Sequence, residues 1–158
     1  MNPVELGQPD PGSRAGPVHG FRVRVYYEDT DSGGIVYHAN YLKFAERART
    51  EFLRFCGIGQ DAMRRDKGVG FALHRCVVDF QSPARLDDLL EVRTRLRGLK
   101  GARVNAEQCL YKVLDNGVDP DWCVRLEVEL VCIGRYGRPV RLPQGVHESF
   151  KTALVSDS

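Results

Sequence analysis

Hydrophobic and polar residues alternate from Phe21 to Val25, which is the two-residue period of a strand with one buried face. The period then changes, because apolar residues recur at helical spacings from Tyr41 to Cys56 with charged residues between them. This pattern predicts one amphipathic helix of about four to five turns. We expect Asn40 to cap its start and Gly57 to close its end. A further one or two helical turns are expected at 60–67.

The two-residue period returns at Phe71 and persists through most of the remaining chain. Four strands are expected, at residues 71–80, 90–96, 104–114 and 122–130. Turn residues separate them at 82–83, 98–101 and 115–121, and such short connections favour a meander. The order of one strand, one long helix and four strands predicts the α+β class. In that class a single domain places its helix against one face of an antiparallel sheet.

The helix covers one face of such a sheet, but the backbone groups at the strand edges stay unpaired. Pairing of an open edge with a second copy of the chain would satisfy the unpaired backbone groups. We therefore expect a homodimer or a homotetramer, and the pattern does not choose between them.

Composition narrows the classes of function. The chain has 158 residues, enough for one ordinary domain, and its net charge of +2 is too small to indicate a nucleic-acid binder. No apolar run approaches the roughly 18 residues of a membrane-spanning helix. The five cysteines are odd in number and form no Cys-x-x-Cys pair, so we interpret them as reduced packing residues.

The ends of the chain differ from its middle. Residues 1–18 hold four of the eight prolines and little apolar content, which predicts a mobile tail. The domain is expected to span 19–150, with a flexible tail at 151–158. The start lacks the continuous apolar stretch of a secretory signal, and together with the cysteine pattern this indicates a cytoplasmic protein.

The segment between the first strand and the long helix concentrates the candidate chemistry. It contains three carboxylates, two adjacent glycines and a histidine: Glu28, Asp29, Asp31, Gly33, Gly34 and His38. The first amides of a helix lack intrahelical partners and can bind an oxygen that gains negative charge. On the residues alone we infer acyl transfer or hydrolysis. Asp31 is the candidate nucleophile or general base, and amides from Val36 to His38 form the candidate oxyanion site.

The same stretch has a simpler interpretation as a polar turn. Aspartate side chains in turns commonly accept hydrogen bonds from nearby backbone amides, and this is the more frequent outcome for an arbitrary aspartate-rich turn. The residue types alone leave both interpretations open.

Several of these residues belong to a longer run that resembles a known family. The runs Val25–Tyr41 and Phe44–Glu51 resemble the 4-hydroxybenzoyl-CoA thioesterase family, most closely its tol-pal-associated acyl-CoA thioesterases, the YbgC group. The turn Ser82–Asp88 resembles the turn between strands in that group. The resemblance covers about Phe21 to Phe150 and implies the hotdog fold, in which an antiparallel sheet wraps around one long central helix.

The resemblance implies an enzyme that hydrolyses acyl-CoA to a free acid and CoA without a cofactor. The family's catalytic carboxylate falls on Asp31 and not on Asp29. Its Val-Tyr-His pattern falls on Val36, Tyr37 and His38, and the amide that polarises the thioester carbonyl falls near His38. Asp31 then either attacks the carbonyl or activates the water that does. Both mechanisms stay open, as does the choice between a direct and a structural role for His38.

Substrate contacts are expected in the same loop and on basic residues elsewhere. The loop candidates are Gly33, Gly34, Val36 and Tyr37. Because CoA carries phosphates, cations are expected at the mouth of the site, and the candidates in or near turns are Lys100, Arg103 and Arg138.

Two side chains outside the loop are assigned structural roles. Glu46 is expected to form a surface ion pair with Arg47 or Arg49, and His74 is expected on the buried face of its strand.

Other functions agree less well with these residues. A metal site is not expected, because the four histidines are scattered, and the Gly-x-Ser-x-Gly elbow of serine hydrolases is missing. Hydration or dehydration of enoyl-CoA on the same fold is one alternative. The other is a non-catalytic acyl-CoA binder or scaffold that contacts envelope or lipid-synthesis proteins. Asp31 favours hydrolysis, because a pure binder needs no carboxylate at the reacting carbonyl.

Overall fold

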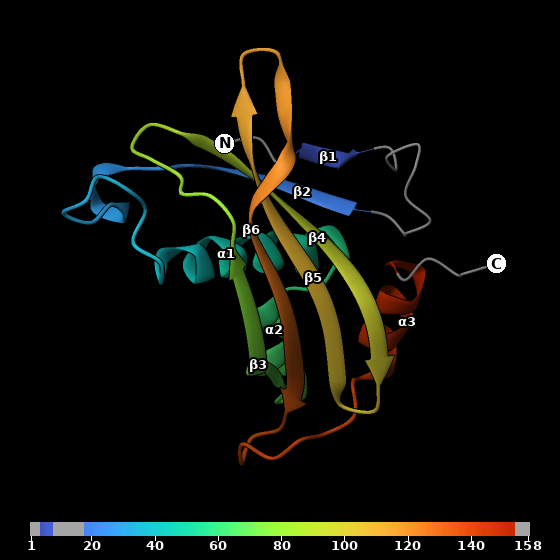
Figure 1. Cartoon of the computed structure of the whole chain (residues 1–158). Helices are drawn as coiled ribbons and strands as arrows, with labels where there is room; N and C mark the ends of the chain where they lie inside the picture. Colours follow the sequence, from blue (N-terminus) through green and yellow to red (C-terminus); the bar gives the residue numbers. More distant parts are fainter. Residues whose placement is uncertain (1–3, 8–17, 154–158) are drawn as a thin grey trace.

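The computed structural model describes residues 4–7 and 18–153. Six strands form one antiparallel sheet (Figure 1): β1 Val4–Gly7, β2 Val18–Arg24, β3 Gly70–Phe80, β4 Leu89–Lys100, β5 Arg103–Leu114 and β6 Gly117–Ile133. The helices are α1 Asn40–Phe55, α2 Gln60–Lys67 and α3 Gln144–Ala153, with a 3₁₀ turn η1 at Tyr27–Asp29. No helix in these ranges is long and apolar enough to cross a membrane.

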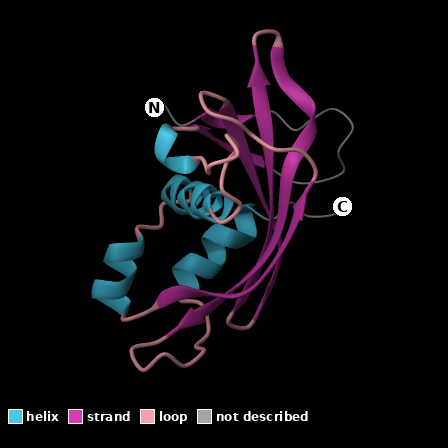
Figure 2. Ribbon diagram, turned by 60° about the vertical axis from the view of Figure 1, so that its left-hand side comes forward, coloured by secondary structure: helices cyan, strands magenta, loops and turns pink. Residues whose placement is uncertain are grey.

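The helices lie on one side of the sheet, and α1 runs across its middle (Figure 2). The core forms where the apolar stripe of α1 meets the inner face of the sheet. Its fully buried members include Phe44, Ala45, Ala48, Val23, Leu90, Val92, Leu110 and Leu126. This arrangement confirms the predicted α+β class with a single long helix against an antiparallel sheet.

The end of α1 follows the prediction. Gly57 has a φ of 79°, and its amide donates to the carbonyl of Arg54 at 2.9 Å. The amide of Ile58 donates to the carbonyl of Leu53 at 2.8 Å. These two bonds form the Schellman motif, which suits glycine because the left-handed conformation carries no Cβ penalty.

The start of α1 differs from the prediction. Asn40 is the first helical residue and does not cap the helix; the cap position is Ala39, which makes no side-chain cap bond. The buried Asn40 amide group instead donates from Nδ2 to the carbonyl oxygen of Asp29 at 2.9 Å. Asn40 therefore ties the preceding loop to the helix.

The strand order corrects the expected meander. It reads β1-β2-β4-β5-β6-β3, so only β4, β5 and β6 form a meander. β2 occupies the free edge of β4, and β3 crosses to the far side of the sheet to pair with β6. The segment 81–88 makes this crossover.

A β-bulge between Leu73 and Arg75 corrects the predicted position of His74. A bulge inserts one extra residue and reverses which side chains face the core. The His74 side chain is 53% exposed, and its Nε2 lies 3.8 Å from Glu129 Oε1. The expectation that His74 is buried is therefore wrong.

The prediction of a loop over residues 115–121 is also wrong. β5 continues to Leu114 and β6 begins at Gly117, so only two residues connect them. This hairpin extends beyond the rest of the sheet (Figure 1).

The expected domain, residues 19–150, begins and ends within a few residues of the start of β2 and the end of α3. β1 lies within the segment expected to be a tail and pairs antiparallel with β2, which begins at Val18. α3 continues to Ala153, past the expected end of the domain at 150. The remainder of the expected tails, residues 1–3, 8–17 and 154–158, lies outside the described residues, so the three-part division stays a prediction.

Candidate active site

The loop between β2 and α1 is held against the crossover segment 81–88. The amide of Val36 donates to the carbonyl of Ala84 at 2.9 Å, and the amide of Val25 donates to the carbonyl of Asp88 at 2.9 Å. From the other direction, the amide of Ala84 donates to the hydroxyl of Tyr41 at 3.0 Å. Two segments that are remote in sequence thus fix the entry to α1.

Tyr41 acts in this arrangement as a buried anchor. Its side chain is 3% exposed, and burial is the main cause that raises the pKa of its hydroxyl. The hydrogen bond from Ala84 opposes this shift, and the nearby charges of Asp88 and Asp31 add to it. A hydroxyl with a raised pKa stays protonated at neutral pH, which suits a structural acceptor better than a base.

Asp31 closes a tight turn and keeps one carboxylate oxygen available. Its Oδ1 accepts a hydrogen bond from the amide of Gly33 at 2.8 Å, and its carbonyl accepts one from Gly34 at 3.0 Å. Within residues 18–153, Oδ2 makes no hydrogen bond, and the residue is exposed. Asp31 therefore does both things that the sequence suggested: one carboxylate oxygen caps the polar turn, and the other is available to a substrate.

The two glycines leave open space around this carboxylate. A Cβ at Gly33 would lie 3.1 Å from Asp31 Oδ1, and Gly34 has a φ of +78°, which side chains rarely adopt. At residues 33 and 34 the turn therefore presents backbone atoms and no side chains beside the Asp31 carboxylate.

Asp29 has only structural partners. Its Oδ2 accepts from the amide of Tyr26 at 2.8 Å, and its carbonyl accepts from the amide of Tyr37 at 2.9 Å and from Asn40. The geometry thus separates the roles of the two aspartates, with Asp29 bracing the loop and Asp31 facing outward.

The amides before α1 are not equivalent. Those of Val36 and Tyr37 already donate to Ala84 and Asp29, and the Val36 side chain is only 3% exposed. Neither amide is free to meet a substrate oxygen, contrary to the expectation for these two residues. Among the described residues, the amide of His38 has no hydrogen-bond acceptor, and it lies just before the positive end of the α1 dipole.

The His38 ring is exposed and contacts the Tyr37 ring in a tilted arrangement, with 4.5 Å between ring centroids. In the described part of the chain it makes no hydrogen bond to Asp31. An orienting bond between these two side chains is therefore not formed in this structure, and a role of His38 toward water or substrate stays a prediction.

A cavity of about 540 Å³ opens beside α1, beginning one turn after His38. It is lined by Leu42, Lys43, Glu46, Arg47, Arg49, Leu73, Cys76 and Leu126, from α1, β3 and β6. Glu46 accepts from the hydroxyl of Thr50 at 3.0 Å and, among the described residues, pairs with neither Arg47 nor Arg49. The predicted ion pair of Glu46 is wrong.

A buried polar network lies beneath this cavity. Arg49 donates from Nη1 to Oε1 of Gln108 at 2.9 Å. Gln108, which is 0% exposed, donates from Nε2 to the carbonyl of Ala45 at 2.9 Å and to the hydroxyl of Thr94 at 3.0 Å. The sequence contains one signal for this network, since Gln108 is a polar residue in phase with the buried Val104 and Leu110 of β5.

The predicted phosphate-binding cations lie away from the loop. Lys100 and Arg103 flank the β4–β5 turn, and Arg103 pairs with Glu129. The opposite end of β4, at Leu89, pairs with Arg24 beside the loop. Eleven residue steps at about 3.3 Å each give a path of about 36 Å along the strand between the two ends. Within one chain the structure does not bring these cations, or the exposed Arg138 after β6, to Asp31.

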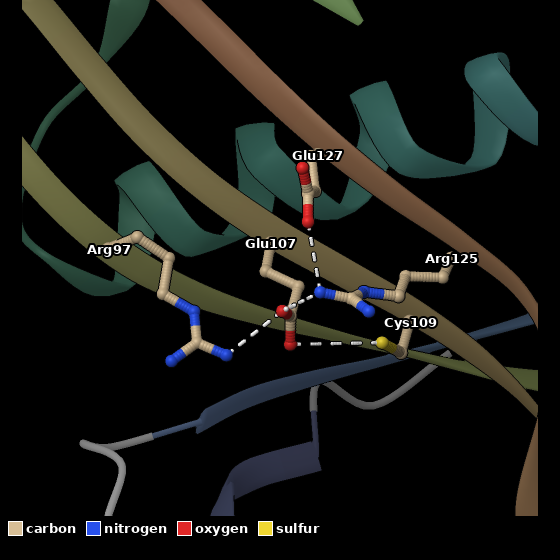
Figure 3. Close-up of polar contacts among 5 residues, drawn as sticks. All are labelled: Arg97, Glu107, Cys109, Arg125 and Glu127. Carbon is tan, nitrogen blue, oxygen red and sulfur yellow. Dashed lines mark hydrogen bonds and ion pairs between the residues drawn. The ribbon is translucent and has the colours of Figure 1, made fainter. Parts of the chain in front are cut away.

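A second charged cluster occupies the sheet face opposite α1 (Figure 3). Glu107 accepts from Arg97 at 2.9 Å and from Arg125 at 3.0 Å, and Arg125 also donates to Glu127 at 2.9 Å. Burial opposes the effect, but these arginines hold the pKa of Glu107 below its usual value. Burial raises the pKa of the neighbouring Cys109 to about 11, so its thiol stays protonated. Each charge is already paired, as in a structural ion network.

One long helix cradled by an antiparallel sheet, with a carboxylate loop at the helix entry, defines a hotdog domain. The fold matches that of a 4-hydroxybenzoyl-CoA thioesterase mutant complexed with 4-hydroxybenzoyl CoA, with a TM-score of 0.78 at 20% identity over 84% of this chain and 97% of that one. Residues 25–150 match the family model of the thioesterase-like superfamily, and the chain belongs to that superfamily.

Relatives with higher sequence identity are also named as thioesterases. The acyl-CoA thioester hydrolase YbgC of Escherichia coli is 39% identical over 137 residues, covering 82% of this chain and 92% of the relative. A probable thioesterase from Bartonella henselae superposes with a TM-score of 0.72 at 37% identity, covering 80% of this chain and 99% of that one. The resemblance to the YbgC group is confirmed.

Proposed function

We propose that the protein is an acyl-CoA thioesterase that hydrolyses the thioester to a free acid and CoA. The observation that carries the proposal is that the loop before α1 holds both a carboxylate oxygen of Asp31 and a backbone amide of His38 that have no hydrogen-bond partner among the described residues. The name of the Escherichia coli relative supports acyl-CoA as the substrate class.

In the proposed mechanism, the thioester carbonyl oxygen accepts a hydrogen bond from the His38 amide. Negative charge that develops on this oxygen is stabilised by that amide and by the α1 dipole. Asp31 either attacks the carbonyl carbon, expelling the CoA thiolate to leave a mixed anhydride that water hydrolyses, or removes a proton from the attacking water. Both routes require an ionised Asp31.

Gly33, Gly34 and Tyr37 complete the proposed contacts. The bare backbone at Gly33 and Gly34 allows the thioester to approach Asp31 closely. Because the Tyr37 amide is engaged, we assign its contact to the exposed aromatic ring.

We also propose that the protein is a homodimer formed through β3, alone or as half of a tetramer. β3 is the last strand of the sheet, and its apolar Leu73, Val77 and Phe80 are 46%, 38% and 54% exposed. An open edge that carries apolar side chains is a typical pairing surface. Leu73 lines the cavity and the Phe80 ring lies 5.9 Å from that of Tyr41, so the second copy would border the site.

The proposed compartment is the cytoplasm. All five cysteines are unpaired, which suits a reducing environment. Contact with envelope or lipid-synthesis proteins stays a prediction.

The proposal is tested by thiol release from short, long and aromatic acyl-CoAs, with wild type beside Asp31→Asn. The asparagine oxygen can still accept from Gly33, so the turn is retained while the charge is lost. We expect activity to fall by roughly two to four orders of magnitude, the scale of lost acid–base or nucleophilic catalysis, with unchanged thermal melting. Full activity in the variant, or a wild type that binds acyl-CoAs without releasing thiol, would refute the proposal. Loss of crotonyl-CoA absorbance without thiol release would indicate a hydratase instead.

A further inference from the structure

Arg49 is a half-buried cation that forms no direct ion pair among the described residues, although the charge of Glu46, which lines the same cavity, acts on it. Its Nη1 donates to the neutral side chain of Gln108, and no carboxylate lies within 4.0 Å of it among the residues that the structure describes. Burial is the main cause that lowers the pKa of its guanidinium, and the charge of Glu46 partly opposes this shift. Buried arginines are normally paired, because an uncompensated charge away from water is costly. Arg49 thus has donors to offer to an anion from outside the chain.

Gln108 holds the guanidinium in a fixed position. Its carbonyl oxygen accepts from Arg49, while its amide nitrogen donates to Ala45 of α1 and Thr94 of β4. Because every polar group of this fully buried side chain is engaged, the position of Arg49 is set by the sheet and the helix together.

The cavity extends along α1 from Leu42, in the first turn of the helix, to Arg49. It begins one turn after His38. Leu42, Leu73 and Leu126 form its apolar walls, and Lys43, Glu46 and Arg47 also line it. Arg49 follows His38 by eleven residues, about 16 Å along the helix, and helical side chains lean back toward the N-terminus. An acyl group that extends along α1 from a thioester at His38 passes Leu42 before it reaches the guanidinium.

We propose that Arg49 is a specificity-determining residue that binds a carboxylate at the far end of the substrate's acyl group. The preferred substrates are then CoA thioesters of dicarboxylic acids. Guanidinium and carboxylate match in geometry and form charge-assisted hydrogen bonds. This inference rests on the proposed thioesterase function and adds its substrate class.

Matched pairs of substrates test the inference. Hexanoyl-CoA is compared with adipoyl-CoA, and octanoyl-CoA with suberoyl-CoA, for wild type, Arg49→Met and Arg49→Lys. We expect Arg49→Met to lower kcat/KM for the carboxylate members by about tenfold to a hundredfold, the range for a hydrogen bond to a charged group. The neutral members should be unchanged, and Arg49→Lys should restore part of the loss. The exposed Arg54, which pairs with Glu51, provides the control variant Arg54→Met, which should behave as wild type.

A measurement on the wild type keeps the inference falsifiable if Arg49→Met does not fold. Free suberate should inhibit wild-type hydrolysis of octanoyl-CoA more strongly than free octanoate does. Equal inhibition, together with equal kcat/KM for neutral and carboxylate substrates, overturns the inference. Absence of hydrolysis of every substrate would instead reject the thioesterase function itself.

Two other sources of an anion are distinguished by further arms. N-acetylcysteamine thioesters carry the same acyl groups without the phosphates of CoA, and the Arg49→Met selectivity change should persist with them. If Arg49→Met weakens neutral and carboxylate CoA substrates equally and the loss disappears with N-acetylcysteamine thioesters, Arg49 binds a CoA phosphate and the inference is wrong. If the variant changes only the association state in sedimentation, a carboxylate of a second copy is the partner and the inference is equally wrong.

Discussion

The hydroxyl of Tyr41 offers a direct test of how the active-site loop is held. Tyr41→Phe removes the acceptor of the Ala84 amide, and both residues are buried, at 3% and 0% exposure. The substitution keeps the aromatic packing against Phe44 and Phe80 and removes one oxygen. It leaves a buried backbone donor unsatisfied, which costs about 1–3 kcal/mol. For a chain of 158 residues this corresponds to a fall in Tm of roughly 2–4 °C per kcal/mol.

Thermal melting at matched protein concentration, followed by thiol-release kinetics, measures both consequences. Because the crossover segment positions the loop through Val36, we also expect a lower kcat with little change in KM. Tyr136→Phe is the matched control, since that side chain is 93% exposed. If Tyr41→Phe melts and turns over like Tyr136→Phe, the Ala84 amide has another acceptor and the anchoring role is refuted.

Three further predictions concern other parts of the fold. Burial lowers the pKa of His19, so its contribution to the free energy of unfolding is retained above pH 6.5 and lost as pH falls below it. Urea midpoints between pH 7 and 5 should decline more steeply for wild type than for His19→Leu, and parallel slopes would contradict this. Gly34→Ala should cost about 1 kcal/mol in melting experiments because of its φ of +78°, whereas Gly145→Ala in α3, where an added Cβ meets nothing within 4 Å, should not destabilise. Val77→Lys should shift sedimentation toward the monomer and Leu114→Lys at the exposed hairpin tip should not; an unchanged association state for Val77→Lys would exclude β3 as the interface.

Features set by local sequence were predictable. The apolar stripe of α1 repeats every three to four residues, so its buried face, including Phe44 and Ala48, follows from the pattern. Gly57 was identifiable because a left-handed residue after a helix strongly favours glycine. The candidate carboxylate Asp31 came from a continuous run just before the helix, where sequence order and spatial order coincide.

Features set by tertiary contacts were not predictable. β3 pairs with β6 because β2 occupies the edge of β4, and the periodicity of a strand contains no information on which strand it pairs with. The exposure of His74 depends on a bulge that its alternating pattern conceals. Likewise, Arg49 looked like any charge on a helix, because its partner Gln108 is 59 residues away in the sequence.

The pairing of distant segments also has a consequence for how activity appears during folding. β4, β5 and β6 join through short hairpins, whereas the loop is fixed by bonds that span 43 residues, from Tyr41 to Ala84, and 63 residues, from Arg24 to Asp87. Contacts of long sequence separation form late, because closure of the intervening chain costs entropy before any contact compensates it. The hairpins should therefore acquire structure first, and the carboxylate and amide of the active site should reach their working positions only in the final step of refolding.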